Sequence, residues 1–203
     1  MFNSKKQFIS NNSLPLFSNY GVQVVSMDDV ANKCGISKKT LYQEFDSKED
    51  LLNFIIENEI KQCEIQLSKV HDSSEDAIKE ILNFLDIMRD FFKAVSPLIM
   101  RDLMKYYIII YSKVLNIIPT KLRPYINKNI KRGIKEGLYK EDISNEEFED
   151  AFVGFWEMIF NQTEIYTQLK YKQTLKFFFN LYIYGLLSTR GLVKFEDFKN
   201  RKG

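Results

Sequence analysis

Apolar residues recur at helical spacing along almost the whole chain. One helix face near the C-terminus is formed by Leu175, Phe178, Phe179, Tyr182, Ile183 and Leu186. Alternating strand patterns and hairpin turns are almost absent. Serines before apolar runs predict helix starts, and four glycines predict helix ends: Gly21, Gly35, Gly137 and Gly191. The pattern therefore predicts an all-α protein.

About nine helices are predicted from these signals. They span residues 4–19, 27–34, 38–44, 48–71, 75–93, 97–106, 108–137 with a break near Pro119–Pro124, 145–168 and 172–190. Three short helices come first and longer ones follow, without a linker between them. The predicted organisation is a small N-terminal domain at residues 1–47 and a larger helical body at residues 48–203.

Two short helices of the N-terminal domain are joined by a tight turn. Ser26 precedes the first helix, Gly35 follows it, and Ser37 precedes the second. Such a pair around a glycine turn is typical of the helix-turn-helix, whose second helix enters the DNA major groove. This segment therefore predicts a DNA-binding function.

The second of these helices has an inward and an outward face. Leu41 and Phe45 are expected to pack on Val30, Ala31 and Ile36. The outward face then carries Lys38, Lys39, Tyr42 and Gln43, with Thr40 at its edge. Lysine can donate to guanine or phosphate, glutamine can pair with adenine, and a tyrosine hydroxyl can donate to phosphate. Taken alone, a lysine pair on a helix is more typical of a solvated face, but the capped helices, the glycine turn and the inward spacing together favour a DNA-reading helix.

The run from Val25 to Leu52 resembles the DNA-binding domain of the TetR family of transcriptional regulators. The matching residues are Ser26, Met27, Asp29, Val30, Ala31, Gly35, Ile36, Ser37, Thr40, Leu41, Tyr42, Phe45, Ser47, Lys48, Glu49 and Leu51. The first helix of the family is matched by Ile9, Leu14, Leu16, Phe17 and Gly21. The resemblance covers about 45 residues at fixed spacings.

The resemblance implies a homodimeric regulator, a repressor that a small-molecule effector releases from an inverted-repeat operator. The residues that it places at the DNA are Ser26, Ser37, Lys38, Lys39, Thr40, Tyr42, Gln43 and Lys48. Lys48 begins the next helix, where backbone amides and its charge favour a phosphate. Lys5 and Lys6 are expected to add contacts from the N-terminal arm.

Three residues of the domain depart from the family pattern. Pro15 is expected to kink or shorten the first helix. Val25 replaces a threonine, and Glu44 places a carboxylate where it would repel phosphate. Residues 1–50 also balance six basic against six acidic side chains, which predicts modest, salt-dependent DNA affinity.

The last two predicted helices, 145–168 and 172–190, are apolar on more than one face. Phe177, Leu181 and Tyr184 lie beside the stripe of the second, and the first carries Ala151, Phe152, Phe155, Trp156, Ile159 and Phe160. A helix that is apolar nearly all round must be covered on both sides. The resemblance implies that these helices form the dimer interface, and a central position within one subunit is the alternative.

The middle helices are rich in aromatic residues and methionine, and the resemblance implies an effector site in this body. The candidate pocket residues are Phe84, Met88, Phe91, Met104, Tyr107, Tyr111, Trp156 and Phe160. Apolar pockets with a few polar tips suit small ligands. At helical spacing, the same residues are also typical of ordinary core.

A basic stretch at residues 113–140 holds eight lysines and arginines and one acid, Glu136. Lys128, Lys131, Arg132 and Lys135 share one helix face. A solvated face is the simpler interpretation. An anionic effector or an additional DNA contact is the alternative.

No cofactor, metal site or catalytic constellation is predicted. Cys34 is expected to be packed and inert, His71 to lie at the surface, and a redox role for Cys63 has no support from its neighbours. Without a signal peptide or a long apolar run, we expect a cytoplasmic protein that is not an enzyme and has no membrane partner. The second hypothesis is a small-molecule-binding helical protein or enzyme with a vestigial helix-turn-helix.

Overall fold

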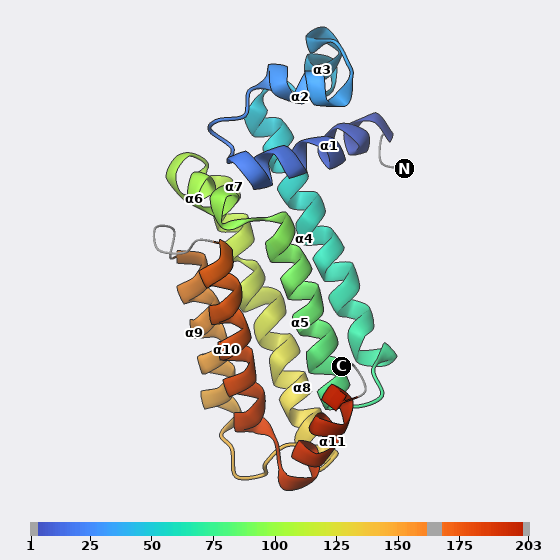
Figure 1. The fold of residues 1–203 in the computed structure, drawn as a ribbon, viewed down its shortest axis with the longest axis vertical. Helices are drawn as coiled ribbons and strands as arrows, with labels where there is room; N and C mark the ends of the chain where they lie inside the picture. The colour runs from blue at the N-terminus through green and yellow to red at the C-terminus, as the bar shows by residue number, and fades with distance from the viewer. Residues whose placement is uncertain (1–3, 162–167, 201–203) are drawn as a thin grey trace. The chain divides into compact units, whose positions relative to one another are not determined.

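The computed structural model describes residues 4–161 and 168–200 (Figure 1). The helices are α1 Ser4–Tyr20, α2 Met27–Cys34, α3 Lys38–Glu44, α4 Lys48–Ser73, α5 Ala77–Ala94, α6 Pro97–Tyr106, α7 Ile108–Leu115, a π-helical turn Ile118–Leu122, α8 Arg123–Lys135, α9 Asn145–Asn161, α10 Gln168–Leu186 and α11 Thr189–Asn200. Within the described ranges, β-structure is limited to an isolated bridge between Tyr139 and Leu187. The predicted all-α fold is confirmed.

The chain forms two compact units, and α4 and α5 contribute to both. The first unit comprises Met1–Ile65 and Met88–Leu115, and the second comprises Gln66–Ile87 and Asn116–Gly203. A domain boundary between residues 47 and 48 stays a prediction. The unit that holds the helix-turn-helix also includes α6 and α7.

The first unit has a dense apolar core beneath α1, α2 and α3. Ile9, Phe17, Val30, Leu41 and Ile55 are fully buried in it. Burial of such side chains stabilises each by about 1.5–3 kcal/mol relative to exposure, which holds these short helices in place.

Pro15 lies inside α1, which nevertheless continues to Tyr20. The expectation that it shortens the helix is therefore wrong. Its ring is exposed, so it displaces no neighbouring element. In the preceding turn, the Ser13 hydroxyl donates to the Ile9 carbonyl at 2.7 Å, an additional bond near the point where proline lacks an N–H.

Aromatic rings fill the core of the second unit. Phe84 of α5 stacks on Tyr125 of α8 with ring centroids 4.7 Å apart, and it also contacts Phe152 of α9. Phe152 in turn contacts Trp156 and Tyr182. These contacts join four helices, because each large ring packs against more than one neighbour.

The prolines near residue 120 divide the predicted 108–137 helix, as expected. Pro119 lies in the first turn of the π-helical segment, and Pro124 lies in the first turn of α8. Proline tolerates the first turn of a helix, where its missing N–H has no intrahelical partner. The predicted break is confirmed.

The C-terminal region differs from the prediction. The predicted 172–190 helix begins at Gln168 and ends at Leu186, and a further helix, α11, follows it. Gly191 is not a helix end but a buried residue of α11, packed against the Leu138 carbonyl where a Cβ atom would not fit. The Ser188 hydroxyl caps α11 by accepting the Gly191 N–H at 3.0 Å. Residues 162–168 of the predicted 145–168 helix lie beyond α9, and 162–167 lie outside the described residues.

Candidate nucleic-acid interface

Helix α2 begins with a complete capping box. The Ser26 hydroxyl accepts the Asp29 N–H at 3.1 Å, and the Asp29 carboxylate accepts the Ser26 N–H at 2.8 Å. Each bond satisfies a backbone N–H that has no intrahelical partner at the start of a helix. Hydrogen bonds from the Ser26 hydroxyl and then its N–H lower the pKa of the Asp29 carboxyl. The start of α2 is therefore fixed by two residues that lie three positions apart.

Gly35 makes the turn between α2 and α3. It adopts a left-handed conformation with φ of 63°, and its N–H donates to the carbonyls of Ala31 and Asn32. The Ile36 N–H also donates to the Ala31 carbonyl, at 3.0 Å. This is the closing pattern that glycine makes possible after a helix. Ser37 then caps α3 by accepting the Thr40 N–H at 3.1 Å.

Helix α3 has the two faces that the sequence predicts. Leu41 and Phe45 are buried, as are Val30 and Ala31 of α2, and Ile36 is half-buried. The exposed side chains are Lys38, Lys39, Tyr42 and Gln43. Thr40 is half-buried at the edge, with its hydroxyl 2.9 Å from that of Ser37. The division into faces is confirmed, and contact with DNA stays a prediction.

Lys38 of this exposed face is paired with an acid of α2. Its Nζ lies 2.7 Å from Oδ1 of Asp28, and both side chains are largely exposed. The hydrogen bond and charge of Asp28 raise the pKa of Lys38. Sequence reasoning missed this partner, because the two residues lie ten positions apart on different helices. A phosphate at α3 would compete with Asp28 for the same ammonium.

Lys48 at the start of α4 is half-buried and bound to the loop between α1 and α2. Its Nζ donates to the Val22 carbonyl at 2.8 Å and to the Val25 carbonyl at 3.0 Å. Burial lowers the pKa of Lys48, and the charge of Asp102 opposes that shift. An ammonium has three N–H donors, so two serve the loop and one can serve a phosphate.

The charge of Glu44 is balanced by a lysine in the first turn of α1, so Lys5 and Lys6 belong to a helix and not to a separate N-terminal arm. Its carboxylate lies 3.6 Å from Nζ of Lys5 and is largely buried, and the Lys6 ammonium lies 5.0 Å from the centre of the Phe45 ring. Opposite charges at this distance attract, which reduces the repulsion that Glu44 would exert on phosphate. Lys5 and Lys6 therefore contact the helix-turn-helix itself.

Comparison with known proteins agrees with this geometry. Residues 12–55 match the family described as "Bacterial regulatory proteins, tetR family". The HTH-type transcriptional regulator SAB2452 of Staphylococcus aureus (strain bovine RF122 / ET3-1) is 30% identical over 83 residues, which are 39% of this chain. That match spans 45% of the relative, so less than half of its length is compared.

The fold is similar to solved structures along almost the whole chain. A transcriptional regulator from Cytophaga hutchinsonii ATCC 33406 superposes with a TM-score of 0.70 at 18% identity, covering 92% of this chain and 100% of that one. The regulatory protein TetR from Rhodobacter sphaeroides gives 0.65 at 14% identity, covering 89% and 98%. The N-terminal domain therefore matches the tetR family of bacterial regulatory proteins, and the fold of the chain is similar to that of these solved regulators.

The candidate effector residues fall in both compact units. Those in the first unit are Met88, Phe91, Met104, Tyr107 and Tyr111, and those in the second are Phe84 and Trp156. Phe84, Met88 and Trp156 are fully buried, whereas Met104 and Tyr107 are half-buried. The Phe160 side chain lies outside the described residues. A pocket formed by these residues stays a prediction.

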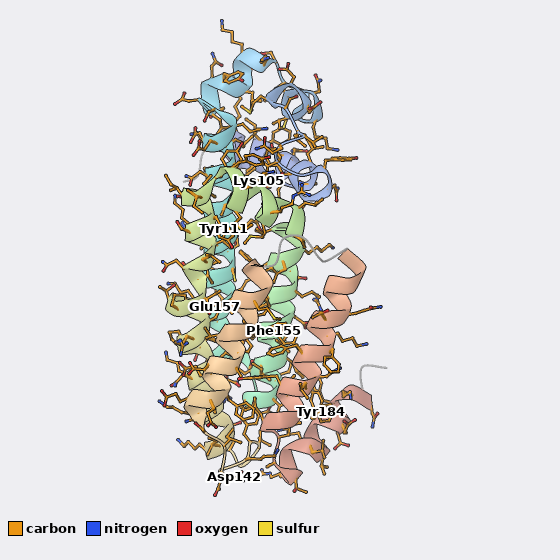
Figure 2. All side chains as sticks on the ribbon, turned by 90° about the vertical axis from the view of Figure 1, so that its left-hand side faces the viewer. Lys105, Tyr111, Asp142, Phe155, Glu157 and Tyr184 are labelled. Atoms are coloured by element: carbon orange, nitrogen blue, oxygen red, sulfur yellow. The ribbon has the colours of Figure 1, made fainter. Side chains whose placement is uncertain are left out.

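The outer face of α10 is strongly apolar and exposed. Phe177 is 71% exposed, Leu181 is 63% exposed, and Tyr184 follows one turn later. Another face of α10 packs on α9, where Phe155 and Phe178 stack in parallel with centroids 3.4 Å apart. Figure 2 labels Phe155 of α9 and Tyr184 of α10. Large contiguous apolar patches on a surface mark interaction sites.

Arg132 of the basic stretch at residues 113–140 is bonded within the protein and largely shielded from solvent. Arg132 of α8 contacts the Glu80 carboxylate at 2.7 Å and Glu136 at 2.7 Å. It also donates to the carbonyls of His71 and Ser74. The prediction of one solvated basic face is therefore wrong for Arg132 and consistent with the exposure of Lys128, Lys131 and Lys135.

The thiols are buried. Cys34 and Cys63 are free, and burial raises the pKa of the Cys63 thiol to about 12, with further contributions from the charges of Glu64 and Glu59. A protonated thiol is a poor nucleophile, which disfavours redox chemistry there. His71 is half exposed, and its Nδ1 lies 3.1 Å from Glu80. None of the helices in the described part of the chain is long and apolar enough to cross a membrane.

Proposed function

We propose that this protein is a transcriptional regulator that binds an inverted-repeat DNA operator as a homodimer and is released by a small molecule. One observation carries the proposal: α3 presents Lys38, Lys39, Tyr42 and Gln43 outward from a capped and fully packed helix-turn-helix. A packed domain with a polar, hydrogen-bonding outer face suits base and phosphate recognition in a major groove.

Each outward side chain has a proposed role. Gln43 pairs with an adenine edge, Lys38 and Lys39 reach guanines or phosphates, and Tyr42 donates to a phosphate. The remaining predicted contacts, to backbone phosphates, come from Ser26, Ser37, Thr40 and Lys48. For Lys38, binding requires exchange of the Asp28 carboxylate for DNA, because both acceptors need the same ammonium.

The proposed dimer interface is formed by α9 and α10. Phe177 and Leu181 of α10 and Met158 of α9 leave apolar surface that a second copy would cover. A two-fold dimer must present its two α3 helices about 34–36 Å apart, or a multiple of that, to read successive major grooves. The operator is accordingly an inverted repeat.

The proposed release follows from a shift in population. An effector that binds better to a conformation with wrongly spaced α3 helices weakens operator binding by that difference in affinity. The candidate lining within the first compact unit is its aromatic and methionine set, which includes Met88, Met104 and Tyr107. Its half-buried tyrosine hydroxyl at residue 107 offers a polar tip to such a ligand.

The experiment is selection of genomic fragments by the full-length protein at low salt, followed by sequencing. Enrichment of one palindrome, with protection of both half-sites, is the expected result. A variant with Lys39 and Gln43 replaced by alanine is the matched control, since both side chains are exposed and their loss leaves the core intact. Absence of any enriched palindrome contradicts the proposal and favours a helical ligand-binding protein or enzyme with a vestigial helix-turn-helix.

A further inference from the structure

A buried aspartate of α6 holds the loop between α1 and α2. Asp102 is 3% exposed, and its Oδ2 accepts the Gln23 N–H at 3.0 Å. Its Oδ1 accepts two bonds from Arg101, at 3.2 Å from Nε and 3.1 Å from Nη2. A buried carboxylate is costly unless such donors satisfy it. The Gln23 N–H is therefore one of the donors that offset the cost of burying this carboxylate.

The backbone at Gly21 is shaped to let the carboxylate approach. Gly21 closes α1 with φ of 85°, and a Cβ atom there would lie 3.0 Å from Oδ2 of Asp102. A side chain at this position would meet both a strained conformation and a close oxygen. The loop therefore accommodates Asp102 in two ways: Gly21 has no Cβ to block the carboxylate, and the Gln23 N–H donates to it.

Two further side chains, those of Lys48 and Ser96, bind the backbone in and just before the same loop. The Lys48 ammonium binds the Val22 and Val25 carbonyls, and Asp102 attracts that ammonium through its charge. At the end of α1, the Ser96 hydroxyl donates to the Ser18 carbonyl at 2.9 Å. Donors and acceptors from α4 and α6 therefore converge on residues 18–25, directly before α2 begins.

We propose that Asp102 is a positioning residue that couples α6 to the DNA-reading helices through the Gly21–Gln23 segment. The proposal rests on the proposed function, because it concerns how the two α3 helices of a dimer are set to their spacing. Helix α6 also carries Met104, a candidate effector residue, and Tyr107 follows its last turn. A shift of α6 on effector binding is transmitted to α2 and α3 because the Gln23 amide is bound to Asp102.

The test compares two DNA targets. Positioning of the two α3 helices matters for an operator with both half-sites, whereas a short duplex with one half-site needs only one correctly folded helix-turn-helix. We expect Asp102→Leu to weaken full-operator binding at least tenfold while half-site binding changes less than twofold. Asp102→Asn keeps an oxygen acceptor for the Gln23 N–H but loses the charge, so its effect should lie between those of the wild type and Asp102→Leu.

Asp90→Leu is the matched control. Asp90 also follows an arginine and binds its guanidinium, with Arg89 Nε at 3.3 Å, but both side chains are exposed. Its loss should leave both DNA affinities unchanged. Circular dichroism at the assay temperature shows whether each variant is folded, and Gln23→Pro provides a second variant that removes the donor N–H instead of the acceptor.

Hydrogen exchange of the Gln23 amide decides the proposal without DNA. We expect exchange to accelerate at least tenfold in Asp102→Leu and less than twofold in Asp90→Leu. Unchanged exchange overturns the proposal, and so does an equal loss of half-site and full-operator binding, which indicates general damage to the fold. If the wild type selects no palindrome, the proposed function fails, and the exchange result still supports or overturns the role of Asp102 as the anchor of this loop.

Discussion

Polar contacts in the helix-turn-helix join residues that are close in sequence, whereas polar contacts in the second compact unit join residues that are far apart in sequence. The caps of α2 and α3 join residues three positions apart, Ser26 to Asp29 and Ser37 to Thr40. In the second unit, Arg132 reaches Glu80 across 52 positions of sequence. The caps are exposed and local, whereas the Arg132–Glu80 pair includes a buried carboxylate and joins segments that are distant along the chain.

The burial of an ion pair determines whether its cation is available to bind another acceptor. Lys38 is exposed, and its pair with Asp28 exchanges readily with another acceptor, because exposed ion pairs stabilise by at most about 1 kcal/mol. Arg132 faces a carboxylate that is only 1% exposed, and its other donors hold backbone carbonyls. The first cation can serve DNA, whereas the second is committed to the fold.

The largest expected effect comes from breaking the long-range network. Arg132→Met removes the guanidinium that pairs with the buried Glu80 carboxylate and should lower the free energy of unfolding by about 3–5 kcal/mol. Chemical denaturation measures this change. Lys131→Met, at an exposed neighbouring position, is the control and should change stability by no more than about 0.5 kcal/mol. Adding Glu80→Gln to Arg132→Met should restore part of the loss, and no restoration would contradict the network.

The next effect concerns base recognition by α3. Gln43→Ala should relax the preference at one operator position by about 1–3 kcal/mol, because a bidentate contact to adenine is lost. Tyr42→Phe should instead weaken binding to all sequences alike, since its hydroxyl is assigned to a phosphate. Binding to a library of operator variants measures both. Uniform weakening by both substitutions would refute the separation into base and phosphate contacts.

Removing the cap of α2 tests the short-range contacts of the helix-turn-helix. Ser26→Ala removes the hydroxyl that accepts the Asp29 N–H and should cost about 1 kcal/mol of stability. The pKa of the Asp29 carboxyl, which Ser26 lowers, should rise toward its ordinary value. A carboxyl whose pKa is lower in the folded than in the unfolded state stabilises the folded protein at pH values above the unfolded-state pKa. This stabilisation is lost as the pH falls through the folded-state pKa. The stability difference between wild type and variant should therefore shrink on acidification below about pH 4.

The smallest expected effect is a change in DNA affinity when the exposed Asp28–Lys38 pair is broken. Asp28→Asn frees Lys38 and removes a negative charge near the DNA, so affinity for all sequences should rise about twofold to fivefold, the range of an exposed ion pair. Fluorescence anisotropy at two salt concentrations measures this. The control is Asp72→Asn, an exposed aspartate of the second unit that carries the same charge change. An unchanged or lower affinity in Asp28→Asn would show that Asp28 does not compete with DNA for Lys38.

Sequence patterns predicted the elements that depend on near neighbours. The bounds of α2 and α3 are those predicted, because a serine cap and a glycine turn act within four residues. The exposed face of α3 followed from the spacing of Leu41 and Phe45. In contrast, α11 was missed because Gly191 resembles a helix end, and only its contact with the Leu138 carbonyl explains a glycine inside that helix.

The partners of the candidate site could not be predicted in the same way. Gln23 and Asp102 are 79 positions apart, and neither has a spacing or motif that indicates the other. Pro15 was expected to kink or shorten α1, and the helix is not shortened, because it continues to Tyr20. Glu44 was expected to repel phosphate, yet Lys5 lies beside it and its side chain is largely buried. In each case, a contact or exposure set by the fold decided the outcome.

The sequence by itself determined the all-α class, the helix-turn-helix and the outward residues of α3, because caps, turns and helical periodicity are properties of short segments. The tertiary structure alone decided which charged groups are free. It placed Arg132 against Glu80, Lys48 against the loop carbonyls and Asp102 against Gln23. Burial makes an unpaired charge costly, so these partners are chosen by packing between distant segments, which no local pattern records.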